Sequence, residues 1–382
     1  MGPAAITEGQ AALTRGDWAR ARSVFAAALE QDETPEALYG LARAVEWAGD
    51  YRAAIDLYGR AYAAFRARGE SRTPALIAAR ELSFLYAAVY GNAAAASGWF
   101  ERARRLALAA GDCVERGWVA LAEALMTDDP DEKAGHVRTA IDIAQRLGDS
   151  DLAMCAIANE GVCLVLKGHF TEGMRRVDES AAAACGGEVK DYVTIGEIYC
   201  HMLLCCELTL DVRRAQEWMS ISESFARGSN SGWVSAICRM HYGGILTAAG
   251  RWADAESELT ASVEAFDIGY RAMRVGALVR LADLRVRQGR LAEAARLLTG
   301  LEFDSNAVRP LARMYLARGE IELAATTLRR RLDANSDSLL EAPELALLAE
   351  VELAAGRFDE AQAVSRRLQS VSADAVVPQM QA

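Results

Sequence analysis

A glycine recurs along this chain with a small residue five places later, usually a bulky one two places later and often an aromatic or aliphatic one nine places later. Gly16, for example, is followed by Trp18, Ala21 and Phe25. Glycine can end a helix in a left-handed conformation that a side chain would penalise. The small residue then lets the next helix approach the first, so the pattern predicts helical hairpins. The glycines are Gly16, Gly49, Gly91, Gly168, Gly250, Gly289, Gly319 and Gly356.

The spacing of these glycines predicts how many hairpins there are. Intact neighbours lie 30 to 42 residues apart, within the range of tetratricopeptide-type repeats. Two gaps are about double, and each holds a turn signal in the same frame, residues 127–130 before Ala134 and residues 209–211 before Ala215. A single hairpin cannot cover its own apolar face, so the hairpins must stack into a solenoid with a long concave surface.

The fold class follows from this array. We predict an all-α, right-handed superhelical solenoid of about ten tetratricopeptide-like hairpins. Residues 1–370 are expected to form one solenoid domain, and residues 371–382 a short tail or the start of a further repeat. No alternating strand pattern of useful length competes with this interpretation.

Composition bounds the environment of the chain. The N-terminus does not resemble a secretory signal, and no run approaches the roughly 18 apolar residues of a membrane helix. The eight cysteines are irregularly spaced in predicted helices, as expected of reduced thiols. A net charge of −11 opposes attraction to nucleic acid or to an anionic membrane. We therefore expect a soluble, cytoplasmic protein that does not itself bind nucleic acid or a membrane.

Motifs for catalysis are missing from the sequence. It contains no phosphate-binding loop, no Gly-x-Ser-x-Gly elbow and no His-Glu-x-x-His helix, and only four histidines. It also lacks a helix-turn-helix module for reading DNA. The expected protein is not an enzyme and needs no cofactor.

Three stretches suggest a family. Residues 107–112 (ALAAGD) and 143–149 (IAQRLGD) close long second helices, and residues 151–161 follow the second of these runs. The chain resembles the helical-repeat region of large, multi-domain LuxR-type transcriptional regulators of actinobacteria. This resemblance implies a sensory arm that receives an inducer or partner protein and controls the DNA-binding module. Neither the ATPase nor the helix-turn-helix of that family is present here, so the implied role is regulatory; the alternative is a free-standing adaptor for protein–protein interaction.

The hairpin frame also identifies the inward positions of the first helices. They are polar or aromatic towards both ends of the array and apolar in the middle. Such a surface suits a partner protein or a small effector, unless the superhelix is tight enough for these side chains to pack against one another. The candidate binding residues are Tyr39, Arg43, Trp47, Trp118, Val162, Val165, Cys200, Leu204, Met240, Arg287, Arg309 and Arg313.

Two groups among the inward residues have alternative interpretations. The three arginines suit a carboxylate or phosphate, or else form a solvated face paired with Asp283 and Glu350. His201 with Cys205, and Cys238 with His241, each share a helix face, which would suit a metal or redox sensor. Cysteine is among the residues most often buried, and no Cys-x-x-Cys pair is present, so we expect core thiols without a bound metal.

Finally, the bulky residue that follows the glycine by two places is expected to belong to the core. Five of these residues are aromatic: Trp18, Tyr51, Phe170, Trp252 and Phe358.

Overall fold

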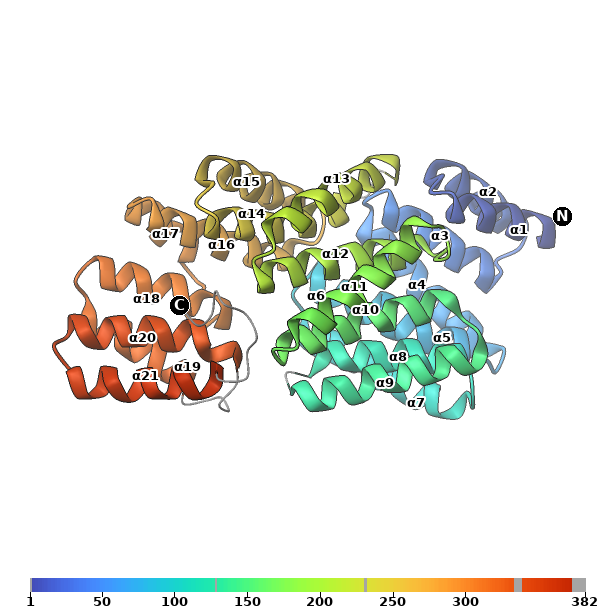
Figure 1. The fold of residues 1–382 in the computed structure, drawn as a ribbon. Helices are drawn as coiled ribbons and strands as arrows, with labels where there is room; N and C mark the ends of the chain where they lie inside the picture. Colours follow the sequence, from blue (N-terminus) through green and yellow to red (C-terminus); the bar gives the residue numbers. More distant parts are fainter. Residues whose placement is uncertain (1, 128, 230–231, 333–338, 373–382) are drawn as a thin grey trace.

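The structure is a computed structural model that describes residues 2–127, 129–229, 232–332 and 339–372. Every regular element in these ranges is helical, and the helices pair into ten hairpins (Figure 1). The prediction of an all-α hairpin solenoid is confirmed. The proposed tail from residue 373 onwards lies outside the described residues. No helix in the described ranges is long and apolar enough to cross a membrane.

The first five hairpins are α1 (Gly2–Thr14) with α2 (Trp18–Gln31), α3 (Pro35–Trp47) with α4 (Tyr51–Ala67), the composite helix α5 (Arg72–Leu76), η1 (Ile77–Ser83) and α6 (Phe84–Ala88) with α7 (Ala93–Ala109), α8 (Val114–Met126) with α9 (Pro130–Leu147), and α10 (Ser150–Leu166) with α11 (Phe170–Cys185). The next five are α12 (Tyr192–Thr209) with α13 (Val212–Ser229), α14 (Gly232–Ala248) with α15 (Trp252–Ile268), α16 (Arg274–Arg287) with α17 (Leu291–Leu298), α18 (Val308–Ala317) with α19 (Ile321–Leu332), and α20 (Ala342–Ala354) with α21 (Phe358–Ser372). The short helices η2 (Arg271–Met273), η3 (Ser305–Ala307) and η4 (Leu339–Glu341) precede α16, α18 and α20.

The repeated glycines end the first helices in the way the sequence predicts. All eight have positive φ, between 62° and 86°. The small residue five places later is buried in each hairpin, and in the fifth hairpin that residue is Gly173. A β-carbon on Gly173 would lie 2.7 Å from the carbonyl oxygen of Gly161, so α10 and α11 could not pack this closely with any side chain there.

The two degenerate hairpins differ from each other. In α12–α13, Leu210 takes the left-handed place of the glycine with φ 55°, and Ala215 is fully buried as predicted. In α8–α9 the predicted slot residue, Ala134, is only half-buried, and Val137 is buried instead. The chain passes from α8 to α9 through an extended Thr127 rather than a left-handed glycine, which displaces the frame of α9.

The prediction that all five aromatic slot residues belong to the core is wrong for two of them. Trp18 and Phe170 are buried and Tyr51 is half-buried, but Trp252 is 40% and Phe358 is 70% exposed. The slot is the first residue of a second helix, at the rim of its hairpin. Trp18 is buried because Trp47 stacks on it at 4.7 Å, and no ring in the described part of the chain packs on Trp252 or Phe358.

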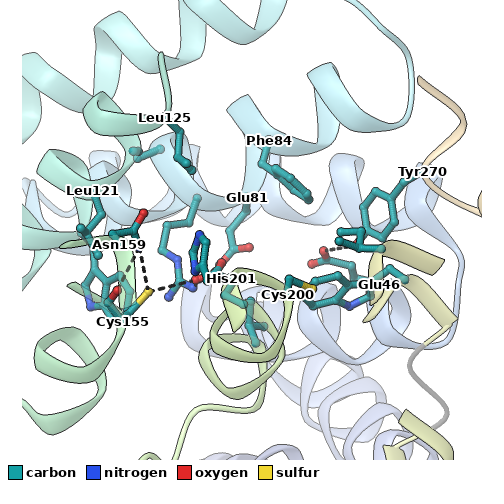
Figure 2. Close-up of a pocket in the computed structure, with 18 of the residues that line it drawn as sticks. Glu46, Glu81, Phe84, Leu121, Leu125, Cys155, Asn159, Cys200, His201 and Tyr270 are labelled. Carbon is teal, nitrogen blue, oxygen red and sulfur yellow. Dashed lines mark hydrogen bonds and ion pairs between the residues drawn. The ribbon is translucent and has the colours of Figure 1, made fainter. Parts of the chain in front are cut away.

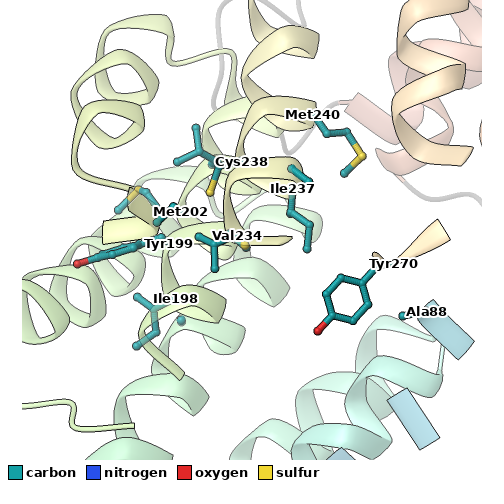
Figure 3. Packing of buried hydrophobic residues seen from close by; sticks show 14 of the residues in the cluster. Ala88, Ile198, Tyr199, Met202, Val234, Ile237, Cys238, Met240 and Tyr270 are labelled. Carbon is teal, nitrogen blue, oxygen red and sulfur yellow. The ribbon is translucent and has the colours of Figure 1, made fainter. Parts of the chain in front are cut away.

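The superhelix returns onto itself, so that the second hairpin meets the sixth and seventh. In Figure 1 the blue α3 lies beside the green α12. Arg43 of α3 pairs with Asp191, the N-cap of α12, at 2.6 Å, and the rings of Trp47 and Trp233 lie 5.9 Å apart. The largest apolar cluster extends from Leu38 to Leu284 through this contact region. Figure 3 shows the part of it contributed by α12 and α14, including Met202 and Cys238.

Candidate binding site

A cavity of about 220 Å³ lies inside the turn of superhelix that this contact closes (Figure 2). Its walls come from the first helices of the second to seventh hairpins, and one further residue lies between α15 and η2. We call it the acidic–aromatic cavity. It is lined by Glu46, Trp47, Ala79, Arg80, Glu81, Phe84, Trp118, Leu121, Ala122, Leu125, Cys155, Asn159, Val193, Glu197, Cys200, His201, Trp233, Ile237 and Tyr270.

One wall of the cavity is built by an irregular helix. The segment η1 is a seven-residue π-helix between α5 and α6. It contributes three consecutive residues, Ala79, Arg80 and Glu81, to the lining. Such π-helical segments are rare and occur frequently at functional sites.

Ion pairs join this wall to the opposite side of the superhelix. Arg80 pairs with Glu197 of α12 at 3.0 Å, and its guanidinium lies 4.0 Å from the ring centroid of Trp118. Behind it, Arg43 binds Asp191. Although burial alone would raise the pKa of Asp191, the charges of Arg43 and Arg80 lower it to about 2. Both guanidinium groups are therefore already engaged with carboxylates.

Two further carboxyl groups face the cavity without a cationic partner. Tyr58 and Tyr270 donate hydroxyl hydrogen bonds to Glu46, at 2.6 and 3.3 Å, and Tyr39 donates to Glu81 at 3.2 Å. Neither carboxyl group makes an ion pair within the described ranges. Burial and the neighbouring charge of Glu81 raise the pKa of Glu46 to about 7, and burial likewise raises the pKa of Glu81.

The polar residues of the third wall are electrically neutral. Burial lowers the pKa of His201, and its Nδ1 is buried without a hydrogen-bond partner. Burial also raises the pKa of Cys155, whose thiol donates to Glu197 at 3.4 Å, and a hydrogen bond with Cys238 together with burial raises the pKa of Cys200. Protonated thiols are poor nucleophiles and poor metal ligands.

The two pairs considered for a metal sensor, His201 with Cys205 and Cys238 with His241, do not come together into one set of ligands in the described part of the chain. Among the residues that the structure describes, no group of three or more His, Cys, Asp or Glu side chains is arranged to hold a metal ion. His241 instead hydrogen-bonds Glu207 through Nδ1 at 2.7 Å, and Cys205 and Cys238 are buried free thiols.

A second, larger cavity of about 420 Å³ lies between the fifth and tenth hairpins. We call it the arginine-rich cavity. Arg287 and Arg313 share Asp283 at 2.8 and 2.7 Å, and Arg309 pairs with Glu344 at 3.3 Å. Its lining is Val165, Leu166, Phe170, Leu204, Glu207, Leu208, Leu210, Gly244, Thr247, Ala248, Val279, Arg280, Asp283, Arg287, Ser305, Asn306, Arg309, Pro310, Arg313, Arg331, Leu339, Pro343 and Glu344.

The sequence left open that these arginines form a solvated face paired with Asp283 and Glu350, and the observed ion pairs largely agree with that interpretation. Asp283 is a partner as predicted, but Glu344 takes the place expected of Glu350, which is exposed and makes no ion pair within the described ranges.

The twelve candidate residues are divided between the two cavities and the core. Trp47, Trp118 and Cys200 line the acidic–aromatic cavity, and Val165, Leu204, Arg287, Arg309 and Arg313 line the arginine-rich cavity. Tyr39 donates a hydrogen bond to Glu81, which lines the first cavity, and Arg43 pairs with Asp191, the N-cap of α12. Val162 and Met240 are buried in the largest apolar cluster, so for these two the tight-superhelix alternative applies.

Sequence reasoning missed several lining residues as members of a site. Arg80, Glu197, Trp233 and Tyr270 were not among the candidates, and His201 was considered only as a metal or redox ligand. The polar lining residues could be recognised from the sequence, because they occupy positions of first helices that the stacking of hairpins would otherwise fill with apolar side chains. Tyr270 could not, since it lies between helices and reaches the cavity only through closure of the superhelix.

Comparisons with known proteins agree with the repeat architecture. The model of the tetratricopeptide repeat family matches residues 6–70 and 245–307. No curated protein matches the chain. Among solved structures, it is similar to a Rap protein complexed with Competence and Sporulation Factor, at 11% identity, 98% coverage of each chain and a TM-score of 0.58. It is also similar to the apo form of RapI, at 11% identity, 98% and 99% coverage and a TM-score of 0.50. The chain is thus a tetratricopeptide-type helical repeat protein.

Proposed function

We propose that this chain is a non-catalytic sensor that binds a small effector in the acidic–aromatic cavity. The observation that carries the proposal is the make-up of its walls. Six successive hairpins each contribute a first helix, and the carboxyl groups of Glu46 and Glu81, which make no ion pair within the described ranges, line the same space. A buried carboxyl group without a cationic partner is costly to ionise, so two of them in one cavity favour a ligand that pairs with them.

The position of the cavity explains how binding would be communicated. Its walls include contacts between residues far apart in sequence, such as Arg80 with Glu197 and Tyr270 with Glu46. An occupant therefore contacts both ends of one superhelical turn at once. A ligand that binds the closed turn more tightly than a more open one would stabilise the closed turn by that difference in affinity. The similar Rap protein was solved with a bound factor, which supports a binding role for this type of fold.

The state of the thiols and arginines at the cavity favours binding over nucleophilic catalysis. The thiols of Cys155 and Cys200 are held protonated, and both arginines near the cavity are neutralised by carboxylates. We propose further that the sensor is the regulatory arm of a LuxR-type transcription regulator. That step is supported by the resemblance of residues 107–112, 143–149 and 151–161 alone, and the fold is equally consistent with a free-standing adaptor. A reading frame that continues past Ala382 into a helix-turn-helix supports the arm, and a stop codon there supports the adaptor.

Binding in this cavity is tested by screening a library of metabolites for compounds that raise the melting temperature. A ligand at 100 times its Kd should stabilise the protein by about 2.7 kcal/mol. Leu121→Trp, which fills the cavity from its wall, and Leu125→Trp, which crowds its exposed side, should abolish the shift. Leu323→Trp, an exposed position on α19, is the control. A ligand that stabilises the wild type and both cavity variants equally binds elsewhere and refutes the proposed site.

A further inference from the structure

The charges that line the acidic–aromatic cavity are unbalanced. Three carboxyl groups, Glu46, Glu81 and Glu197, face it, against one guanidinium, that of Arg80. Arg80 is committed to Glu197 at 3.0 Å. The pair behind the wall, Arg43 with Asp191, is balanced within itself. The carboxyl groups left without an ion pair are therefore Glu46 and Glu81, whose hydrogen bonds come from tyrosine hydroxyls.

Aromatic rings surround one of these carboxyl groups. The ring of Phe84 lies 5.5 Å from that of Tyr270, which lies 6.2 Å from Trp233, which in turn lies 5.9 Å from Trp47. The four rings form a continuous arc, and the hydroxyl of Tyr270 within it binds Glu46. Figure 2 shows Glu46 next to Tyr270 with Phe84 above them, while Leu125 and Leu121 lie at the other end of the view. Phe84 is 39% and Leu125 is 66% exposed, so apolar side chains at both places reach solvent.

Aromatic faces together with carboxylates are the surroundings in which proteins hold organic cations. A cation is attracted to the negative face of an aromatic ring, and an N–H donor forms strong, charge-assisted hydrogen bonds to a carboxylate. The same composition disfavours anions, which would meet two carboxyl groups in a water-poor site. The cavity thus selects by charge as well as by shape.

On this basis, and resting on the proposed function, we propose that the effector is a small organic cation, an ammonium or guanidinium group carried on an apolar stem. The cationic nitrogen lies between Glu46 and Glu81 and against the aromatic arc. The stem extends towards Phe84.

The experiment compares matched pairs of probes by isothermal titration calorimetry. Phenethylammonium is paired with 2-phenylethanol, which has the same ring and a neutral hydroxyl group. N-acetylarginine amide is paired with N-acetylcitrulline amide, which replaces guanidinium by a neutral urea. Phenethylammonium should bind at least about tenfold more tightly than 2-phenylethanol, because a charge-assisted hydrogen bond is lost with the charge.

Variants locate the effect. Glu46→Gln and Glu81→Gln should each weaken phenethylammonium binding by about tenfold or more and leave 2-phenylethanol unchanged. Glu264→Gln, an exposed carboxyl group of α15 outside the cavity, should change neither. Circular dichroism verifies that each variant is folded, and if one of the two cavity variants is not, the other together with Trp233→Leu carries the test.

Several results would overturn the inference. Equal binding of the charged and neutral members of both pairs removes the cationic selectivity, as does binding by neither. Binding of N-acetylarginine amide in preference to N-acetylcitrulline amide, even without phenethylammonium, supports the cationic class through its guanidinium member. A neutral or anionic library hit that Leu121→Trp abolishes leaves the proposed function standing and refutes only the cationic class, whereas the absence of any such hit refutes both.

Discussion

At the ends of the first helices, single residues hold the backbone in the left-handed region. Glycine does this in eight hairpins, and Leu210 is the one other residue type found there in the described chain. A left-handed conformation costs an ordinary residue roughly 1–2 kcal/mol. Leu210 is partly exposed and lies on the rim of the arginine-rich cavity, so its side chain contributes little packing in return.

Leu210→Gly is therefore expected to stabilise the protein. Relief of strain exceeds the entropy that glycine adds to the unfolded chain, for a net gain of about 0.5–1 kcal/mol in the free energy of unfolding. Urea unfolding followed by circular dichroism measures it. Leu210→Ala keeps the strain and serves as the control. A glycine variant no more stable than the alanine variant would show that the turn is not strained.

The small residue five places after each glycine, in contrast, does not tolerate a larger side chain. Ala54 is fully buried where α4 meets α3. Ala54→Leu should force the two helices apart and cost about 1–3 kcal/mol through overpacking. Ala63→Leu, at an exposed position of the same helix, should leave the midpoint of thermal unfolding nearly unchanged. Equal melting of the two variants would mean that the frame is misassigned.

Between elements, one buried ionic cluster ties three first helices together. Glu207 of α12 binds Arg280 of α16 through two bonds of 2.7 Å and His241 of α14 at 2.7 Å. A β-carbon on Gly244 of α14 would lie 2.1 Å from an oxygen of Glu207, so only glycine leaves room for this carboxylate. Burial would raise the pKa of Glu207, but Arg280 and His241 lower it to about 2.

Glu207→Gln leaves the guanidinium of Arg280 buried without its counter-charge. The expected loss is about 3 kcal/mol in the free energy of unfolding, measured in urea near neutral pH. Glu217→Gln, which removes an exposed carboxyl group from α13, should cost less than about 0.5 kcal/mol. Similar losses for the two variants would mean that the cluster does not stabilise the packing of these helices.

The same cluster has a defined pH dependence. The pKa of Glu207 is lower in the folded than in the unfolded protein, so its contribution is complete above the ordinary value of 4.5 and is lost as the pH falls towards about 2. The difference in stability between wild type and Glu207→Gln should therefore shrink on acidification. A difference that stays constant from pH about 5 to about 2 would contradict the assignment.

For the whole molecule, the fold was more predictable than the site. The spacing of Gly16, Gly49 and their equivalents is a local signal, repeated in each hairpin, and it located all ten hairpins because each is stabilised by its nearest neighbours. The frame also pointed Trp47 and Trp118 inwards, where they line a cavity.

The rest of the site depends on the closure of the superhelix. Tyr270 meets Glu46, and Asp191 meets Arg43, only because small rotations between successive hairpins add up to a closed turn. No periodicity in the sequence specifies that sum. The exposure of Phe358 has a similar cause, since burial of its slot depends on what a distant segment places against it. Local patterns therefore predict the hairpin, and contacts between distant hairpins determine the site.

Closure of the superhelix leads to a prediction about stability and pH. The pKa of Glu46 is raised to about 7 by burial and by Glu81, with Arg43, Tyr58 and Tyr270 acting against these effects. In the folded protein Glu46 thus binds a proton that the unfolded chain releases above about 4.5. Because the folded state holds the extra proton, this contribution to stability is complete below that value and is lost as the pH rises through about 7.

Glu46→Gln isolates the effect, because the amide cannot titrate. The stability of wild type relative to Glu46→Gln should fall by about 3 kcal/mol between pH about 5 and about 8. Urea unfolding at a series of pH values measures the difference, and buried His201 and His241, whose lowered pKa values act in the opposite direction, cancel between the two proteins. Glu264→Gln should follow the wild type at every pH. Parallel curves for wild type and Glu46→Gln would place Glu46 in water rather than in a closed cavity, and the closure of the superhelix around it would have to be abandoned.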